Sequence, residues 1–178
     1  RGYGKDAPDP RWPGGARVAV QFVLNYEEGG ENCVLHGDAA SEAFLSEIPG
    51  AVPFVGQRHM NMESIYEYGA RAGFWRLLRL FDARRLPFTS FAVATALEKN
   101  TEVIDAMRAS GHEIATHGYK WIDYQNVPAE VEKDHIRRAV ELHTRLTGER
   151  PRGFYQGRMS PRTRQLMLEV GSELGAFD

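Results

Sequence analysis

Apolar and polar residues follow two different periods along the chain, one typical of buried strands and the other of amphipathic helices. Short apolar runs rich in β-branched and aromatic residues predict strands over residues 16–26, 88–94, 113–117 and 153–156. Apolar residues three and four positions apart predict helices over residues 63–84, 101–110, 128–147 and from Ser160 to about Val170. The remaining segments are predicted to be an extended arm (1–15), a long irregular stretch (29–62) and the start of a fifth strand (175–178).

Strands that alternate with helices in this order predict parallel βα units in a single α/β domain over residues 1–178. A closed (β/α) barrel typically needs about 250 residues, so this chain would supply just over half of one. Half a barrel would expose unpaired strand edges, which promote aggregation. We therefore expect that the native protein is longer or that a second chain completes the barrel.

The composition narrows the classes of partner and location. Hydrophobic residues make up 42% of the chain and charged residues 26%, which is typical of an ordinary globular protein. The net charge of −2 gives no electrostatic reason to expect nucleic acid or an anionic membrane as a partner. No apolar run approaches the roughly 18 residues that span a bilayer. The single cysteine, Cys33, cannot form an intrachain disulfide, which favours a cytoplasmic location.

Polar side chains of a kind used in catalysis follow the predicted strands. Glu27 and Glu28 come directly after the first strand, His117 ends the third, and Gln156 and Arg158 follow the fourth. In a parallel barrel these strand ends converge on one face. A carboxylate can take a proton from water, an imidazole can donate one, and a guanidinium can hold a developing oxyanion. The set therefore indicates hydrolysis of a carbonyl compound.

Each of these residues also has a simpler structural interpretation. The two acids could be solvated, and His117 or Arg158 taken alone would more often be a structural or ion-pairing residue. Trp121 and Tyr155 could belong to the core or line a pocket. The other histidines do not follow strands and are interpreted as structural or solvated: His36, His59, His112, His135 and His143.

A metal site can be tested against the residue spacing. Glu28 and His117 are possible ligands, but catalytic zinc usually takes three protein ligands. A histidine four residues after His117 would supply the third, and that position holds Trp121. We therefore expect no metal or other cofactor, with a divalent metal such as zinc as the less favoured alternative if a segment outside this chain adds a ligand.

Three short motifs resemble those of the polysaccharide deacetylases, the family with a NodB-homology domain. Residues 26–29 (Tyr-Glu-Glu-Gly) are similar to its Phe-Asp-Asp-Gly motif, residues 117–121 lie where it has His-Ser/Thr-x-x-His, and residues 153–158 lie where it has an Arg-containing motif. In that family the first Asp is the catalytic base, and the second binds a metal with the two histidines. Here both Asp are Glu, and Trp121 replaces the second histidine.

This departure resembles the branch that contains the metal-independent allantoinases of purine (urate) catabolism. The similarity extends over long blocks: residues 1–4, 22–31, 35–38, 41–47, 62–69 and 118–125. It implies a distorted (β/α) barrel, of which this chain would be the N-terminal part, and assembly as a homo-oligomer, often a tetramer. It also implies hydrolytic opening of the hydantoin ring of allantoin, a small ureide, to give allantoate.

The resemblance implies a role for each candidate residue. Glu27 would be the base that activates water, Glu28 would orient water or substrate N–H groups, and His117 would donate a proton or polarise the carbonyl. Arg158 would bind the carbonyl or ureido group. The expected substrate-binding residues are Asn25, Tyr26, Trp121, Tyr155 and Gln156. Two alternatives remain open, a metal-dependent deacetylase or amidase acting on N-acetyl sugars or other cyclic amides, and a non-catalytic homologue.

Overall fold

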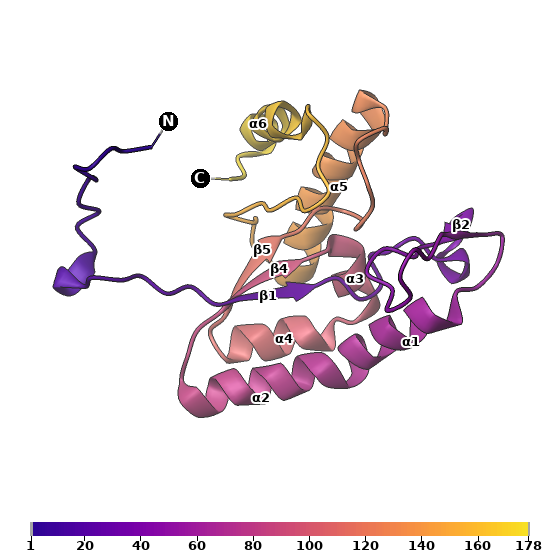
Figure 1. Ribbon diagram of the computed structural model, residues 1–178, viewed down its shortest axis with the longest axis horizontal. Coiled ribbons are helices and arrows are strands. Elements are labelled where there is room, and N and C mark those ends of the chain that lie inside the picture. The colour runs from indigo at the N-terminus through magenta and orange to yellow at the C-terminus, as the bar shows by residue number, and fades with distance from the viewer. Residues whose placement is uncertain (1, 178) are drawn as a thin grey trace.

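The structure, a computed structural model, describes residues 2–177 and is an α/β arrangement built around a parallel sheet (Figure 1). The strands are β1 (Val23–Tyr26), β2 (Ala40–Ser41), β3 (Phe54–Val55), β4 (Thr89–Ala92) and β5 (Glu113–Thr116). The helices are α1 (Met60–Tyr68), α2 (Phe74–Arg84), α3 (Ala94–Lys99), α4 (Glu102–Ala109), α5 (Ala129–Thr147) and α6 (Thr163–Leu174), with a π-helical turn at Gly69–Gly73.

The parallel sheet brings the predicted strand ends together. Its order is β1-β4-β5, and both pairs of neighbours are parallel. Tyr26 is in register with Ala92, and Ala92 with Thr116, so the three strands end at one level. Glu27 and His117 each follow the last residue of their strand and therefore leave the sheet at the same edge.

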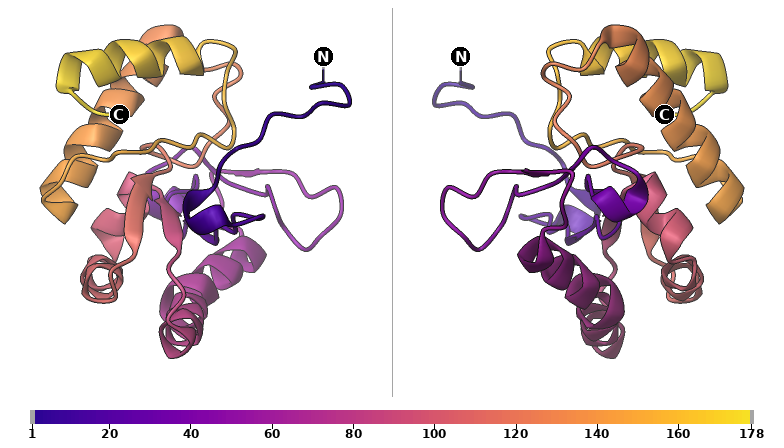
Figure 2. Two further views of the ribbon diagram at one scale, coloured as in Figure 1. Left: turned by 90° about the vertical axis from the view of Figure 1, so that its left-hand side faces the viewer. Right: turned by 90° about the vertical axis from the view of Figure 1, so that its right-hand side faces the viewer.

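The main core lies between this sheet and the helices that cover it. Figures 1 and 2 show α2 and α4 side by side against the sheet, with α5 and α6 following around it. Leu24 and Tyr26 of β1 face this core, together with Phe74 and Leu78 of α2 and Ile104 of α4. Because successive strand residues point to opposite faces, Asn25 and Glu27 belong to the other face of the sheet.

Two predicted strands are wrong in length or absent. Residues 16–22 are not a buried strand, since Val18 and Val20 are each 72% exposed. Pairing begins only where the Thr89 N–H donates to the Phe22 carbonyl, and the preceding residues extend away from the helices as an arm (Figure 1). The fourth predicted strand, residues 153–156, is reduced to one parallel bridge between Thr116 and Phe154.

The helices follow the predicted periodicity with shifted boundaries. The helix predicted over 63–84 starts earlier, at Met60, and the π-helical turn divides it into α1 and α2. The helix predicted from Ser160 runs instead from Thr163 to Leu174, where Gly175 ends it in a left-handed conformation. Residues 176–177 are irregular rather than a strand, and residue 178 lies outside the described residues. The short helix α3 and the β2–β3 hairpin were not predicted. No helix within residues 2–177 is long and apolar enough to cross a membrane.

Candidate active site

The centre of the site is a contact between Glu27 and His117, which are 90 positions apart in sequence. His117 Nε2 lies 3.0 Å from Glu27 Oε1. The other ring nitrogen, Nδ1, lies 2.5 Å from the backbone carbonyl oxygen of Tyr155. The imidazole is 1% exposed, while Glu27 keeps about 15% of its side-chain surface open to solvent. The Glu27 carboxylate is therefore partly accessible to solvent, whereas the imidazole that it contacts is not.

These two contacts fix where protons can lie. A backbone carbonyl only accepts hydrogen bonds, so Nδ1 of His117 must carry a hydrogen. Nε2 of a neutral ring would then be an acceptor, so a hydrogen bond across the 3.0 Å contact with Glu27 needs one proton between the two atoms. The pair consequently shares a single proton, either as carboxylic acid and imidazole or as carboxylate and imidazolium.

Glu28, predicted to join this pair, lies in a different place. Its carboxylate accepts a hydrogen bond from the Glu27 N–H (3.1 Å) and packs on Gly69 of the π-helical turn. It lines a separate cavity of about 660 Å³ together with Tyr66 and Lys99. Burial raises the pKa of the Glu28 carboxyl, and backbone hydrogen bonds offset this only in part. The structure brings Glu27, but not Glu28, into contact with His117.

Arg158 is held by a residue that the sequence did not single out. Its guanidinium donates to Glu42 Oε2 (3.0 Å), and both side chains are largely buried. The other carboxylate oxygen of Glu42 accepts the N–H groups of Ala43 and Phe44. The guanidinium carbon also lies 4.4 Å from the Phe44 ring centre and 5.1 Å from that of Trp121. Arg158 thus connects the long segment between β1 and α1, through Glu42, with Trp121.

Of the predicted substrate-binding residues, Tyr155 and Asn25 are exposed, whereas Trp121 and Gln156 are buried. Tyr155 is 49% exposed and stacks on Phe91 at 4.8 Å, beside His117. Trp121 and Gln156 are buried nearby, with the Gln156 amide filling the space beside Gly118. Asn25 is exposed on the same sheet face as Glu27.

Tyr26 does not fit the predicted substrate-binding role. It is 1% exposed, packs edge-on to Phe74, and accepts a hydrogen bond at its hydroxyl from Asn100. Burial raises the pKa of this hydroxyl to about 12. Tyr26 therefore offers no free surface to a ligand, because its position in β1 directs it to the helix-covered core.

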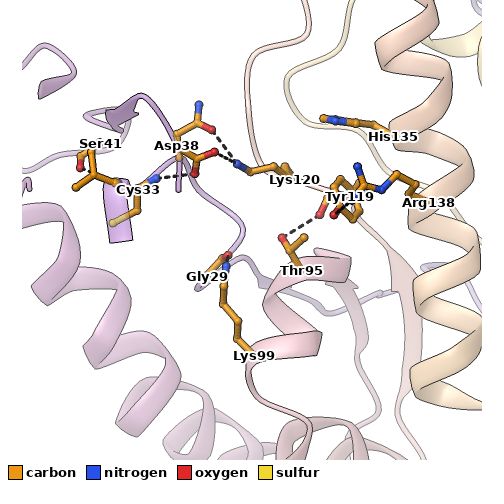
Figure 3. Close-up of polar contacts among 12 residues, drawn as sticks. Gly29, Cys33, Asp38, Ser41, Thr95, Lys99, Tyr119, Lys120, His135 and Arg138 are labelled. Atoms are coloured by element: carbon orange, nitrogen blue, oxygen red, sulfur yellow. Dashed lines mark hydrogen bonds and ion pairs between the residues drawn. The ribbon is translucent and has the colours of Figure 1, made fainter. Parts of the chain in front are cut away.

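A polar network ties the long loop to the segment that carries Trp121 (Figure 3). Lys120 bridges Asp38 and Asn32, and the Cys33 N–H donates to the other oxygen of Asp38. The backbone N–H of Trp121 donates to the Gly30 carbonyl at 2.8 Å. Sequence reasoning missed Glu42, Lys120 and Asp38, because no local pattern indicates which charged residues of a long loop will be paired.

The resemblance to deacetylases implies a metal beside His117, and the residues present do not fit one. Within residues 2–177 no group of three or more His, Cys, Asp or Glu side chains is arranged to hold a metal ion. The indole nitrogen of Trp121 carries a hydrogen and cannot be a ligand. The carboxylate of Glu28 lies against Gly69 instead.

Several histidines predicted to be structural are buried in packed surroundings. His112 stacks on Phe88 at 3.7 Å and accepts the Phe88 N–H, and His59 accepts the Met62 N–H at the start of α1. His143 is 2% exposed, and burial lowers its pKa to about 4. His135 contacts the Tyr124 hydroxyl at 2.9 Å.

The sequence of the chain matches the family model for polysaccharide deacetylase over residues 61–175. The chain belongs to the polysaccharide deacetylase family. A Schizosaccharomyces pombe protein named "Putative polysaccharide deacetylase" is 42% identical over 176 residues, covering 97% of this chain and 55% of that protein. Relatives of known structure share the family's fold over nearly all of this chain.

Two solved structures are similar to this member of the family. A crystal structure of Puue allantoinase is 57% identical with a TM-score of 0.91, covering 96% of this chain and 56% of the other. A probable polysaccharide deacetylase from Pseudomonas aeruginosa PAO1 is 60% identical with the same TM-score, covering 96% and 57%. The chain thus spans about half the length of these relatives. The match confirms the predicted polysaccharide deacetylase fold, of which the described residues form part of the barrel.

Proposed function

We propose that the protein is a hydrolase that opens the hydantoin ring of allantoin to give allantoate, with Glu27 as the base that activates water. The observation that carries the proposal is the 3.0 Å contact between Glu27 Oε1 and His117 Nε2, in a histidine whose Nδ1 lies on the Tyr155 carbonyl. The similarity to the structure of Puue allantoinase supports the choice of substrate.

The shared proton allows a balanced reaction. In the carboxylate–imidazolium form, Glu27 takes a proton from water while the water oxygen bonds to the ring carbonyl carbon. The carbon–nitrogen bond then breaks, and His117 Nε2 gives its proton to the departing nitrogen. The product is a carboxylic acid and an opened ureide. Transfer of the new Glu27 proton to His117 Nε2 restores the starting pair.

The other residues around this pair bind and orient the substrate. Arg158 is paired with Glu42, and its guanidinium lies against the Phe44 and Trp121 rings, so its charge is already compensated within the protein. A site without an uncompensated positive charge suits an uncharged ring better than an anion. Tyr155, which stacks on Phe91, provides a second partly exposed aromatic surface beside His117.

The proposal is tested by assaying the full-length protein for allantoate formation, with and without a chelator. We expect turnover that a chelator does not abolish, because the residues around His117 do not fit a metal. Absence of ureide turnover in a folded, full-length preparation would reject the proposed substrate.

A second candidate function is a deacetylase acting on N-acetyl sugars. The names of the Schizosaccharomyces pombe and Pseudomonas aeruginosa relatives favour it. It predicts release of acetate from an N-acetylated oligosaccharide and loss of that activity on chelation, with recovery on adding zinc. The same preparation can be tested on both substrates, so the two functions are separated in one experiment.

A further inference from the structure

Trp121 carries a hydrogen-bond donor that no described residue uses. Its side chain is 5% exposed, and its Nε1 atom is buried without a hydrogen-bond partner among residues 2–177. An indole N–H can only donate, so the group is left unsatisfied in the folded protein. Buried donors are nearly always paired, because leaving one unpaired costs folding free energy.

This donor borders the same small space beside Gly157 as His117. A Cβ placed on Gly157 would lie 3.9 Å from Trp121 Nε1, 3.7 Å from His117 Nε2 and 3.3 Å from His117 Cε1. The space exists because residue 157 has no side chain. Its φ is not in the left-handed region, so the backbone conformation alone does not require glycine there.

The indole is held in a fixed orientation. Arg158 lies over the ring with its guanidinium carbon 5.1 Å from the centre, and the Phe44 ring is tilted against it at 5.2 Å. The backbone N–H of Trp121 is anchored on the Gly30 carbonyl. A donor that is oriented before substrate arrives needs no reorganisation when charge develops on a bound oxygen.

We propose that the Trp121 indole N–H binds the carbonyl oxygen of the amide to be hydrolysed and stabilises the negative charge that forms on it when water adds. The inference rests on the proposed hydrolysis and deepens it by naming the group that recognises the substrate. The recognised chemistry is the uncharged carbonyl of a cyclic amide or ureide, placed between this donor and the Glu27–His117 pair.

The first test replaces Trp121 by Phe in the full-length protein, which keeps an aromatic ring and removes the N–H. We expect kcat for allantoin to fall about 100-fold to 1000-fold with a smaller rise in KM, because the donor also binds the ground-state carbonyl but binds the oxyanion of the transition state more strongly. Trp75→Phe on α2 is the matched control and should retain both constants, since Trp75 packs edge-on to Phe74 beside the main core. An unchanged kcat in folded Trp121→Phe would overturn the proposal.

A second test does not depend on turnover or on the stability of that variant. The indole ¹H–¹⁵N signal of Trp121 is followed in the full-length wild-type protein while hydantoin is added as the probe. A new hydrogen bond to the carbonyl should move the indole proton downfield, and the Trp75 signal should stay in place. A saturating hydantoin titration that leaves the Trp121 signal unmoved would reject the donor role. A shifted signal in a protein without allantoin turnover would instead keep the donor and reject allantoin as substrate.

A third variant tests the space itself. Gly157→Ala adds one methyl group between the donor and His117, at ordinary contact distances from the two nitrogens but at a tight 3.3 Å from His117 Cε1, which would have to move by a few tenths of an ångström. We expect KM for allantoin to rise and the hydantoin-induced shift to weaken, while the thermal midpoint changes little. Unaltered binding of both compounds would show that the carbonyl does not occupy this space.

Discussion

The carboxylates of Glu27 and Glu28 leave the end of β1 on opposite sides. Tyr26 points into the helix-covered core, and Glu28, two residues later, follows it toward α1 and Gly69. Glu27 follows Asn25 onto the other face and contacts His117. The alternation of side chains along the strand thus continues for two residues past its end at Tyr26. Adjacent acids at a strand end therefore serve two different environments.

Replacing Glu27 by Gln should abolish turnover without unfolding the protein. The amide that replaces the carboxylate cannot take a proton from water, and it cannot share a proton with His117. We expect kcat for allantoin to fall by at least about 100-fold, a typical contribution of a positioned base. Circular dichroism and the thermal midpoint should match those of the wild type. Near-normal activity in a folded Glu27→Gln protein would remove Glu27 from the mechanism.

Replacing Glu28 by Gln should stabilise the protein, increasingly so as the pH rises. The folded-state pKa of Glu28 lies above its usual value of 4.5, so the folded state disfavours the ionised form. Its contribution to stability is complete below about pH 4.5 and is lost as the pH rises through the raised pKa. The thermal midpoint of Glu28→Gln should match the wild type at pH 4 and exceed it at pH 7.

Glu67→Gln is the control for this pH effect. Glu67 is 61% exposed and pairs with Arg71 on the surface, where ion pairs contribute little to stability. A difference between Glu28→Gln and wild type that stays constant from pH 4 to pH 7 would contradict a raised pKa at Glu28.

At the scale of elements, helices and strand ends could be predicted, and strand extent could not. The helical period identified the apolar face of α2, α4 and α5, because each buries that face against the sheet or a neighbouring helix. The β-branched run over 16–22 predicts a buried strand only if another strand pairs with it. Within residues 2–177, β1 pairs only with β4, which leaves Val18 and Val20 exposed. Whether such a run is buried depends on residues far away in the sequence that pair with it. The local pattern of apolar residues does not identify them.

The site could be predicted to a similar extent. The contact between Glu27 and His117 could be predicted, because polar residues that follow parallel strands meet at one sheet edge. The pairing of Glu42 could not be predicted, since its partner Arg158 is 116 positions away and only the folded loop brings them together. The π-helical turn could not be predicted either, because two glycines within a helical pattern lower helix propensity without indicating a change in hydrogen bonding at Gly69–Gly73.

Glu132 links α5 to the start of α6 and should be essential to their packing. Its carboxylate is 1% exposed and accepts hydrogen bonds from Ser160 Oγ (2.6 Å) and Thr163 Oγ1. Glu132→Ala would leave two buried hydroxyls without this partner. We expect a loss of about 3 kcal/mol in the free energy of unfolding, measured by urea denaturation. Glu130→Ala, which also lies in the first turn of α5 but is exposed, should cost much less. Equal losses in the two variants would contradict a role for the buried carboxylate.

At the scale of the whole molecule, residues 16–23 and the side of β1 that no strand within residues 2–177 pairs form an exposed, aggregation-prone sheet edge. Val18, Val20 and Val23 are exposed along this edge, and unpaired strands with apolar side chains pair readily with other chains. The 178-residue chain prepared alone should therefore associate with rising concentration, as measured by light scattering. The double substitution Val18→Lys with Val20→Lys should reduce this association.

Leu168→Lys is the control for that experiment. Leu168 is 66% exposed on α6, away from the sheet edge, and its replacement adds charge without changing a strand. Equal reduction by Leu168→Lys would attribute association to general hydrophobicity. A chain that stays monomeric at high concentration would contradict the proposal that this sheet edge promotes association.

The hydrogen bond from His117 Nδ1 to the Tyr155 carbonyl has a consequence for genetics. The acceptor that sets the tautomer of the imidazole belongs to the main chain, so every amino acid at position 155 supplies it. Side-chain scanning would therefore score residue 155 only for its aromatic surface and overlook its part in proton placement. What matters for proton placement at this position is the path of the backbone. An insertion nearby that shifts this path would remove the acceptor from His117 Nδ1 although every catalytic residue is still encoded.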